Sequence, residues 1–221
     1  MKYSLTLLMA KFVTHDTKQL VLSKPEGFEF EPGQGAAIAI DQPLWRERAR
    51  PFTITSLRED RVLELIIKRY PDRDGLTVAL HNLKPGSGLT LGKAFGNITY
   101  QGPGVFIAAG TGITPFLAIL RQLAADGTLD GHSLLFSNKS EQDLICGQEL
   151  LHYLGKRCTF TFTREHELAQ DGHHFGAAFL AGHIRDLKQN FYVCGPEGFV
   201  AAVNEHLLVL GVHPDRLVYE H

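Results

Sequence analysis

The stretch that decides the fold is Gly110-Thr111-Gly112-Ile113-Thr114-Pro115, which follows the apolar run from Val105 to Ala109. This arrangement is typical of a turn between a strand and a helix. Glycine lets the backbone approach a ligand closely, and the first N–H groups of a helix have no partner within it. Together with the helix dipole, those groups favour an anion such as a phosphate. Pro115 stands where the usual dinucleotide fingerprint has a third glycine. The stretch alone therefore does not exclude a turn that only connects a strand to a helix.

Beyond this turn, strand and helix patterns alternate to the end of the chain. Apolar runs predict strands at 105–109, 133–136, 158–162 and 191–193. Helical spacing predicts helices at 113–125, 148–154 and 176–187, and a last one that follows Pro196 and ends at Gly211. This order is typical of a parallel sheet with helices on both faces.

The chain before residue 100 is different, because its apolar runs are short, rich in β-branched residues and separated by turn residues. Strands are expected at 3–14, 19–23, 35–40, 51–56 and 62–70, with one helix at 75–83. Several short strands at this spacing predict an antiparallel barrel or sandwich. The glycine- and proline-marked passage 96–104 is the expected boundary. We therefore predict two domains, an N-terminal antiparallel β-barrel at 1–100 and an α/β parallel-sheet domain at 101–221.

Composition narrows the class of protein. The 221 residues are 44% hydrophobic, which is enough for a real core, and 22 basic and 24 acidic residues give a net charge of -2. We expect no nucleic-acid partner, although a local basic patch stays open. Cys146, Cys158 and Cys194 have no metal-site or disulfide spacing, which favours a reducing cytoplasm. The N-terminus is predicted to be a strand rather than a signal peptide, and no apolar run predicts membrane insertion.

Ligands of such parallel sheets bind outside the carboxyl ends of the strands. Those ends carry 137–139, 163–165 and 194–198, besides the opening turn. Arg164 and Lys139 each offer a cation, and no acid directly follows the second strand to bind a ribose diol, which favours a phosphorylated ribose. Arg164 is the better candidate, because a guanidinium grips a phosphate with two hydrogen bonds. Solvated surface charge is the alternative for both.

Cys194, followed by Gly195 and Pro196, ends an apolar strand and opens a helix. A thiol at a helix start can be reactive, and the alternative is a small buried hydrophobe. In the barrel half, Arg50-Pro51-Phe52-Thr53 combines a phosphate-binding cation, a stacking ring and a hydroxyl, which a bound flavin nucleotide needs. Phe52 could instead be a core aromatic. Asp74-Gly75-Leu76-Thr77 opens the predicted helix and is a second candidate anion site.

Four motifs in this order resemble those of the ferredoxin-NADP reductase superfamily of flavoenzymes, in particular its compact bacterial members without an attached ferredoxin domain. The resemblance covers almost the whole chain. The motifs are Arg50-Pro51-Phe52-Thr53 for an Arg-x-Tyr-Ser type, Gly75-Leu76-Thr77 for Gly-x-x-Ser/Thr, Gly110 to Pro115 for Gly-x-Gly-x-x-Pro, and Cys194-Gly195-Pro196 for Cys-Gly-Pro.

The resemblance implies a role for each motif. Arg50 would hold the flavin phosphate, Phe52 would lie against the isoalloxazine ring, and Thr53 would hydrogen-bond near N5. Gly75 and Thr77 would hold the FAD pyrophosphate. The nicotinamide nucleotide would lie along Gly110 to Pro115, close to Thr111 and Cys194, and its 2′-phosphate would meet Thr163 and Arg164. We count Thr53 and Cys194 as catalytic and the following residues as cofactor-binding: Arg50, Pro51, Phe52, Thr53, Ile67, Lys68, Gly75, Leu76, Thr77, Gly110, Thr111, Gly112, Thr114, Pro115, Thr163, Arg164, Cys194, Gly195, Pro196 and Glu220.

The implied reaction is hydride transfer from NADPH or NADH to the flavin, with NADPH favoured, followed by release of electrons to another acceptor. FAD is expected rather than FMN. Because no cysteines have iron-sulfur spacing, the acceptor would be a separate ferredoxin- or flavodoxin-like protein. We expect a monomer.

The chain departs from the family pattern in two ways. Phe52 and Thr53 replace the commoner Tyr and Ser, which keeps the ring and the alcohol but removes the phenol. Family members commonly end on a Glu and, one residue later, an aromatic that covers the flavin, whereas this chain ends Tyr219-Glu220-His221.

Two other functions stay open. The chain could be a flavin-binding electron-transfer subunit of a larger complex, without turnover of its own. It could also bind a metal through its dense histidines, although their spacing matches no familiar ligand pattern. Those histidines are His166, His173, His174 and His183.

Overall fold

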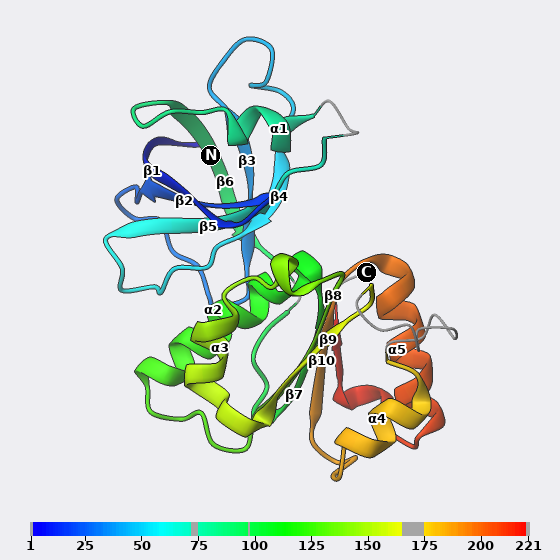
Figure 1. The fold of residues 1–221 in the computed structure, drawn as a ribbon. Helices are drawn as coiled ribbons and strands as arrows, with labels where there is room; N and C mark the ends of the chain where they lie inside the picture. The colour runs from blue at the N-terminus through cyan, green and yellow to red at the C-terminus, as the bar shows by residue number, and fades with distance from the viewer. Residues whose placement is uncertain (1, 72–74, 97, 165–174, 220–221) are drawn as a thin grey trace.

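The computed structural model describes residues 2–71, 75–96, 98–164 and 175–219, which form two sheets (Figure 1). The first sheet is antiparallel, with the strand order β4-β3-β6-β1-β2-β5. Its strands and the one helix beside them are β1 (Tyr3–Thr14), β2 (Thr17–Ser23), β3 (Gly35–Ile40), β4 (Arg50–Thr53), β5 (Val62–Lys68), α1 (Leu76–His81) and β6 (Gly88–Phe95).

The two edge strands of this sheet meet, which makes it a barrel. Ile54, directly after β4, bridges to Leu65 on β5, and Thr55 N donates to Glu64 O over 2.8 Å. Alternate residues along each strand point inward. The barrel core accordingly collects leucines and isoleucines from several strands, with Phe28 and Phe30 from the loop before β3.

The second sheet is parallel and has the order β11-β10-β7-β8-β9. Its strands and short 3-10 turns are β7 (Gly104–Ala109), η1 (Gly110–Gly112), β8 (Ser133–Asn138), η2 (Glu141–Asp143), η3 (Gly155–Arg157), β9 (Cys158–Phe162), β10 (Asn190–Cys194), η5 (Pro214–Arg216) and β11 (Leu217–Tyr219). Gly104 and Asn190 begin the β7–β10 register, and a Cβ on Gly104 would collide with the Asn190 carbonyl. Glycine at this position therefore allows the two central strands to pair.

Helices cover both faces of the parallel sheet (Figure 1). On one face, α2 (Ile113–Ala125) and α3 (Gly147–Leu154) pack on Phe106 and Ala108 of β7. On the other, α4 (Ala177–His183) and α5 (Glu197–Val209) pack on Val105 and Ile107. This alternation along β7 is what a strand that is buried on both faces requires.

The predicted fold class is confirmed, and the differences lie in single elements. β6 and β11 were not predicted. The strand expected at 51–56 is β4 and ends at Thr53, because the chain turns there to bond with β5 through Ile54 and Thr55. The last predicted helix is α5, which ends at Val209, two residues before Gly211 with its φ of +99°.

Among the described residues, the structure contains no helix with both the length and the apolar character needed to cross a membrane.

Candidate active site

A cleft of about 740 Å³ lies where the barrel meets the parallel sheet. The barrel contributes residues of β4, the end of β5 and Thr77 of α1. The parallel sheet contributes the residues that follow β7, β8, β9 and β10, which are the carboxyl ends singled out from the sequence. The predicted site residues that line the cleft are Pro51, Phe52, Thr53, Ile67, Lys68, Thr77, Gly110, Thr111, Gly112, Thr114, Pro115, Thr163, Cys194, Gly195 and Pro196.

The turn after β7 is built around two glycines. Gly110 has a φ of +54°, a conformation that favours glycine, and opens η1. A Cβ on Gly112 would collide with the backbone carbonyl of Cys194. The Thr114 hydroxyl donates to Thr111 O over 2.9 Å, so it braces the turn itself. Pro115 lies in the first turn of α2, where a missing N–H costs little.

The turn after β10 lies against the first one. Gly195 faces the ring of Phe199 and the methyl group of Ala109, which a Cβ at this position would meet. Cys194 is half-buried and packs against the core beneath α2. The two turns, one from each central strand of the sheet, therefore form one continuous backbone surface of the cleft.

The barrel wall of the cleft is β4. Phe52 is half-buried and packs against the barrel core while also lining the cleft. Thr53, its neighbour, pairs with Gly35 on β3, and a Cβ on Gly35 would strike the Phe52 backbone. The ring and the hydroxyl predicted to meet a flavin thus come to one side of the cleft, opposite the two glycine turns.

Some predicted residues lie outside this lining. Arg50 is exposed at the start of β4, with Nη1 3.3 Å from Ala49 O. Gly75 precedes α1, and the Leu76 side chain is buried in the barrel core because it is apolar and faces inward. Arg164 is exposed directly after Thr163, and its N–H donates to Lys139 O over 2.8 Å. Asp74 and Glu220 lie outside the described residues.

Among the predicted site residues that the structure describes, Lys68 is the one whose charge is already matched. Its ammonium lies 2.8 Å from Asp16 Oδ2 and 3.1 Å from Asp143 Oδ1. Burial works to lower the pKa of Lys68, but these two carboxylates outweigh it and raise that pKa above its ordinary value. The lysine thus holds part of the cleft wall together.

Sequence reasoning missed several lining residues. Tyr70 and Phe95 are large aromatic side chains that are 42% and 48% exposed at the cleft, and Gly33 and Ile145 also line it. An exposed aromatic on a strand is a signal for ring stacking, but Phe95 belongs to the strand that was not predicted. The cleft therefore offers a planar ligand three aromatic rings, including Phe52.

Of the histidines considered for a metal site, His166, His173 and His174 lie outside the described residues. His183, at the end of α4, stacks on Phe179 with ring centroids 4.1 Å apart and places Nδ1 2.8 Å from Phe179 O. The local packing of its own helix accounts for the position of His183.

Two protein families match adjoining parts of the chain. An FAD-binding domain matches residues 2–103, and an oxidoreductase NAD-binding domain matches residues 106–205. The chain belongs to the ferredoxin reductase-like flavoprotein superfamily. The cleft described above is lined by residues of both matched parts.

Several curated relatives of the chain are longer than the chain itself. It is 28% identical, over 92% of its length, to the ferredoxin–NAD(P)(+) reductase component of the naphthalene 1,2-dioxygenase/salicylate 5-hydroxylase systems of Ralstonia sp., and covers 64% of that protein. It is 30% identical to a flavohemoprotein of Vibrio cholerae and covers 51% of it. The chain spans about two thirds or less of the length of several curated relatives it matches, these two included.

Among solved structures, the flavohem-like FAD/NAD-binding domain of nitric oxide dioxygenase from Vibrio cholerae has a TM-score of 0.82 and 25% identity. That match covers 98% of this chain and 97% of the other. A ferredoxin-NADP⁺ reductase from Neisseria gonorrhoeae, at 20% identity, shares the fold with a TM-score of 0.78 over 99% of this chain and 98% of the other.

Proposed function

We propose that the chain is an NAD(P)H-dependent flavoprotein reductase that holds FAD and passes electrons to a separate redox protein. The observation that carries the proposal is the cleft, in which Phe52 and Thr53 of the barrel face the glycine turns after β7 and β10. Its volume lies in the range of ligand and cofactor sites. Bound FAD would supply the hydride acceptor and the electron store, because the cofactor carries this chemistry.

The residues of the cleft suit these two ligands. Three aromatic side chains can stack on planar rings, and Thr53 supplies a hydroxyl for a ring nitrogen. The glycine turns bring backbone close to the ligand, and the N-terminus of the 13-residue α2 favours phosphate. We assign residues 50–53, 67–68 and 75–77, with Glu220, to the flavin. Residues 110–115, 163–164 and 194–196 are assigned to the nicotinamide nucleotide.

The proposal also covers the choice of nucleotide and flavin, the domain boundary, the compartment and the oligomeric state. Arg164 beside Thr163 supports NADPH over NADH, because a guanidinium recognises a phosphate through paired hydrogen bonds. The anion site at Gly75 and Thr77 supports FAD over FMN. We place the domain boundary at residue 100, between the last strand of the barrel and β7. We also infer a cytoplasmic monomer whose three cysteines, all described, carry thiols rather than disulfides.

A second candidate is a flavin-binding subunit of a larger assembly. It is supported by the names of several relatives, which are reductase components of multicomponent oxygenase systems. In that case the chain would be reduced by nicotinamide nucleotide but would not reduce free ferredoxin or flavodoxin.

One experiment tests the proposal. The purified chain is expected to be yellow, or to become so with FAD, and to lose its flavin absorbance anaerobically when NADPH or NADH is added. Released flavin is then identified, and a ferredoxin or flavodoxin is added to observe its reduction. Protein that stays colourless with FAD and FMN contradicts the proposal. Bleaching without reduction of either carrier favours the second candidate.

A further inference from the structure

The strand β5 faces two cores at once. Leu63, Leu65 and Ile67 point into the barrel core. The alternate residues Glu64, Ile66 and Lys68 point the other way, as the twofold period of a strand requires. That outward face is covered by the parallel-sheet domain. Ile66 is 5% exposed and belongs to the core beneath α2, while Glu64 and Lys68 form ion pairs on either side of it.

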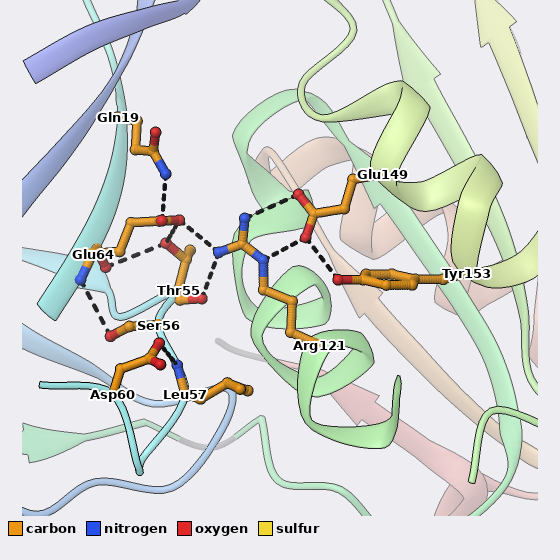
Figure 2. A network of polar contacts seen from close by, with 9 residues as sticks. All are labelled: Gln19, Thr55, Ser56, Leu57, Asp60, Glu64, Arg121, Glu149 and Tyr153. Carbon is orange, nitrogen blue, oxygen red and sulfur yellow. Dashed lines mark hydrogen bonds and ion pairs between the residues drawn. The ribbon is translucent and has the colours of Figure 1, made fainter. Parts of the chain in front are cut away.

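Glu64 reaches Arg121 of α2, at the centre of a network of polar contacts (Figure 2). Arg121 Nη1 lies 2.5 Å from Glu64 Oε1 and 2.7 Å from Thr55 O, both in the barrel half. Its Nε and Nη2 bind the two carboxylate oxygens of Glu149 on α3, at 2.6 and 3.0 Å. Tyr153 donates to the same carboxylate over 3.1 Å. One guanidinium therefore joins both halves of the chain.

The side chains of this network are largely shielded from water. The Arg121 and Glu64 side chains are each 15% exposed, and that of Glu149 is 27% exposed. Glu64 also accepts from the Thr55 hydroxyl over 2.8 Å and from Gln19 Nε2. A planar guanidinium with fixed donors and a carboxylate held by two other groups have few alternative geometries. The pair therefore fixes the orientation of α2 relative to β5 and also holds the two elements together.

Both elements lead directly into the cleft. The end of β5 lines it with Ile66, Ile67 and Lys68. The helix α2 starts at the glycine turn, so Arg121 and Pro115 are parts of one rigid element. A change in the angle between α2 and β5 at Arg121 would thus move the glycine turn after β7 relative to β4, the barrel wall of the cleft.

We propose that Arg121 is a positioning residue for hydride transfer. Its ion pair with Glu64 sets the distance between the glycine turn after β7, which we assign to the nicotinamide nucleotide, and β4, which we assign to the flavin. This inference rests on the proposed function. Arg121 does not line the cleft itself, and its effect passes through α2 and β5. Transfer over a short distance is sensitive to placement, and a misplacement of about 1 Å can lower a rate about a hundredfold.

The first measurement is anaerobic stopped-flow reduction of the flavin by NADPH and NADH. Arg121→Met and Glu64→Gln are expected to lower the rate at saturating nucleotide by about tenfold to a hundredfold. The nucleotide concentration at half-saturation, the flavin content and reduction by dithionite are expected to match the wild type. Arg121→Lys, which restores a charge but not the planar fork, is expected to recover part of the rate.

Arg157→Met is the matched control, because Arg157 binds Leu129 O and Asp130 within the parallel-sheet half only. It is expected to reduce at the wild-type rate. If Arg121→Met does not fold, Glu64→Gln and Arg121→Lys carry the test. The proposal is overturned if the variants reduce the flavin at the wild-type rate, if their loss of rate equals that of the control, or if missing flavin explains the loss.

The second measurement does not depend on activity. Scanning calorimetry of the full chain is expected to give one unfolding transition for the wild type and for Arg157→Met. Arg121→Met is expected to give two, since the halves lose the ion pair between α2 and β5. A single transition in Arg121→Met overturns the proposal. If the wild type takes no hydride at all, the proposed function fails, and calorimetry still decides whether Arg121 couples the two halves.

Discussion

Lys68 on β5 forms an ion pair with Asp143 in η2, with 3.1 Å between Nζ and Oδ1, and so connects the barrel to the parallel-sheet domain at the cleft. Both side chains are largely buried, at 16% and 11% exposed. Burial works to raise the pKa of Asp143, but bonds from Ser140 and Lys68 hold it below its ordinary value. The contact is therefore stronger than an exposed surface pair.

The first prediction concerns this ion pair. Asp143→Asn is expected to lower the free energy of unfolding near neutral pH by about 1.5 to 3 kcal/mol, the usual range for a hydrogen bond to a charged group. Because the folded-state pKa of Asp143 is lowered, its contribution is present above the unfolded value of 3.8 and is lost as the pH falls through the folded value. Urea unfolding measures both effects. Asp130→Asn, at a fully exposed carboxylate, should change little.

The second prediction concerns two buried histidines. His81 and His132 are 6% and 1% exposed, and burial lowers the pKa of each below 6.5. The unfolded chain therefore binds more protons in this window, so stability is full above about pH 6.5 and falls as the pH drops toward the folded pKa values. Thermal unfolding between about pH 8 and pH 5 measures the slope.

A matched pair of variants assigns that slope. His81→Gln is expected to reduce the loss of melting temperature on acidification, although it lowers stability at neutral pH because Nε2 lies 2.7 Å from Ile67 O. His152→Gln, on the exposed side of α3, is the control for the loss of an imidazole at the surface. Equal slopes in the wild type and His81→Gln would show that His81 is not one of the responsible groups.

The third prediction concerns the contact between the two glycine turns. Gly112→Ala places a methyl group against the Cys194 carbonyl, and backbone at the end of a central strand cannot easily move. A loss of about 1 to 3 kcal/mol is expected, together with weaker nucleotide binding. Gly198→Ala is the control, since a Cβ there meets open space in the first turn of α5. Melting temperature and nucleotide titration measure the two effects, and equal behaviour of the variants would contradict the prediction.

The fourth prediction concerns recognition of the 2′-phosphate. Arg164→Ala is expected to lower the preference for NADPH over NADH by about tenfold or more, because a charge-assisted contact contributes about 1.5 to 3 kcal/mol. Steady-state kcat/KM for both nucleotides measures the preference. Lys139→Ala, at the neighbouring strand end, should change it less. An unchanged ratio in Arg164→Ala would place Arg164 among ordinary surface charges.

The local patterns of the chain predicted most of its elements, because the helices carry a helical spacing and four of the five parallel strands are apolar runs. β6 was missed although Leu89 and Leu91 alternate in it, because Gly88 and Gly92 interrupt the strand pattern. It lies between β1 and β3, and a Cβ on Gly92 would come close to Ala37 of β3. β11 has only three residues and is held by pairing with β10.

The candidate site also has a part that could be predicted from the sequence and a part that could not. Motifs at strand ends could be found, because ligands of parallel sheets bind there. The polar network around Arg121 could not be predicted, because its partners Glu64 and Glu149 lie 57 and 28 residues away in the sequence. One signal was present. Arg121 is a single charge in the apolar helix α2, and such a residue needs a partner when it is buried.

Ile66 gives the two halves a shared hydrophobic core. Its side chain leaves a barrel strand and is buried among the residues of the other domain, together with Ile98 from the connecting passage. A chain cut near residue 100 would leave a hole in the nucleotide half and an exposed isoleucine on the barrel. Exchange of one half for that of a relative would therefore succeed only if the new partner reproduces the surface that receives Ile66.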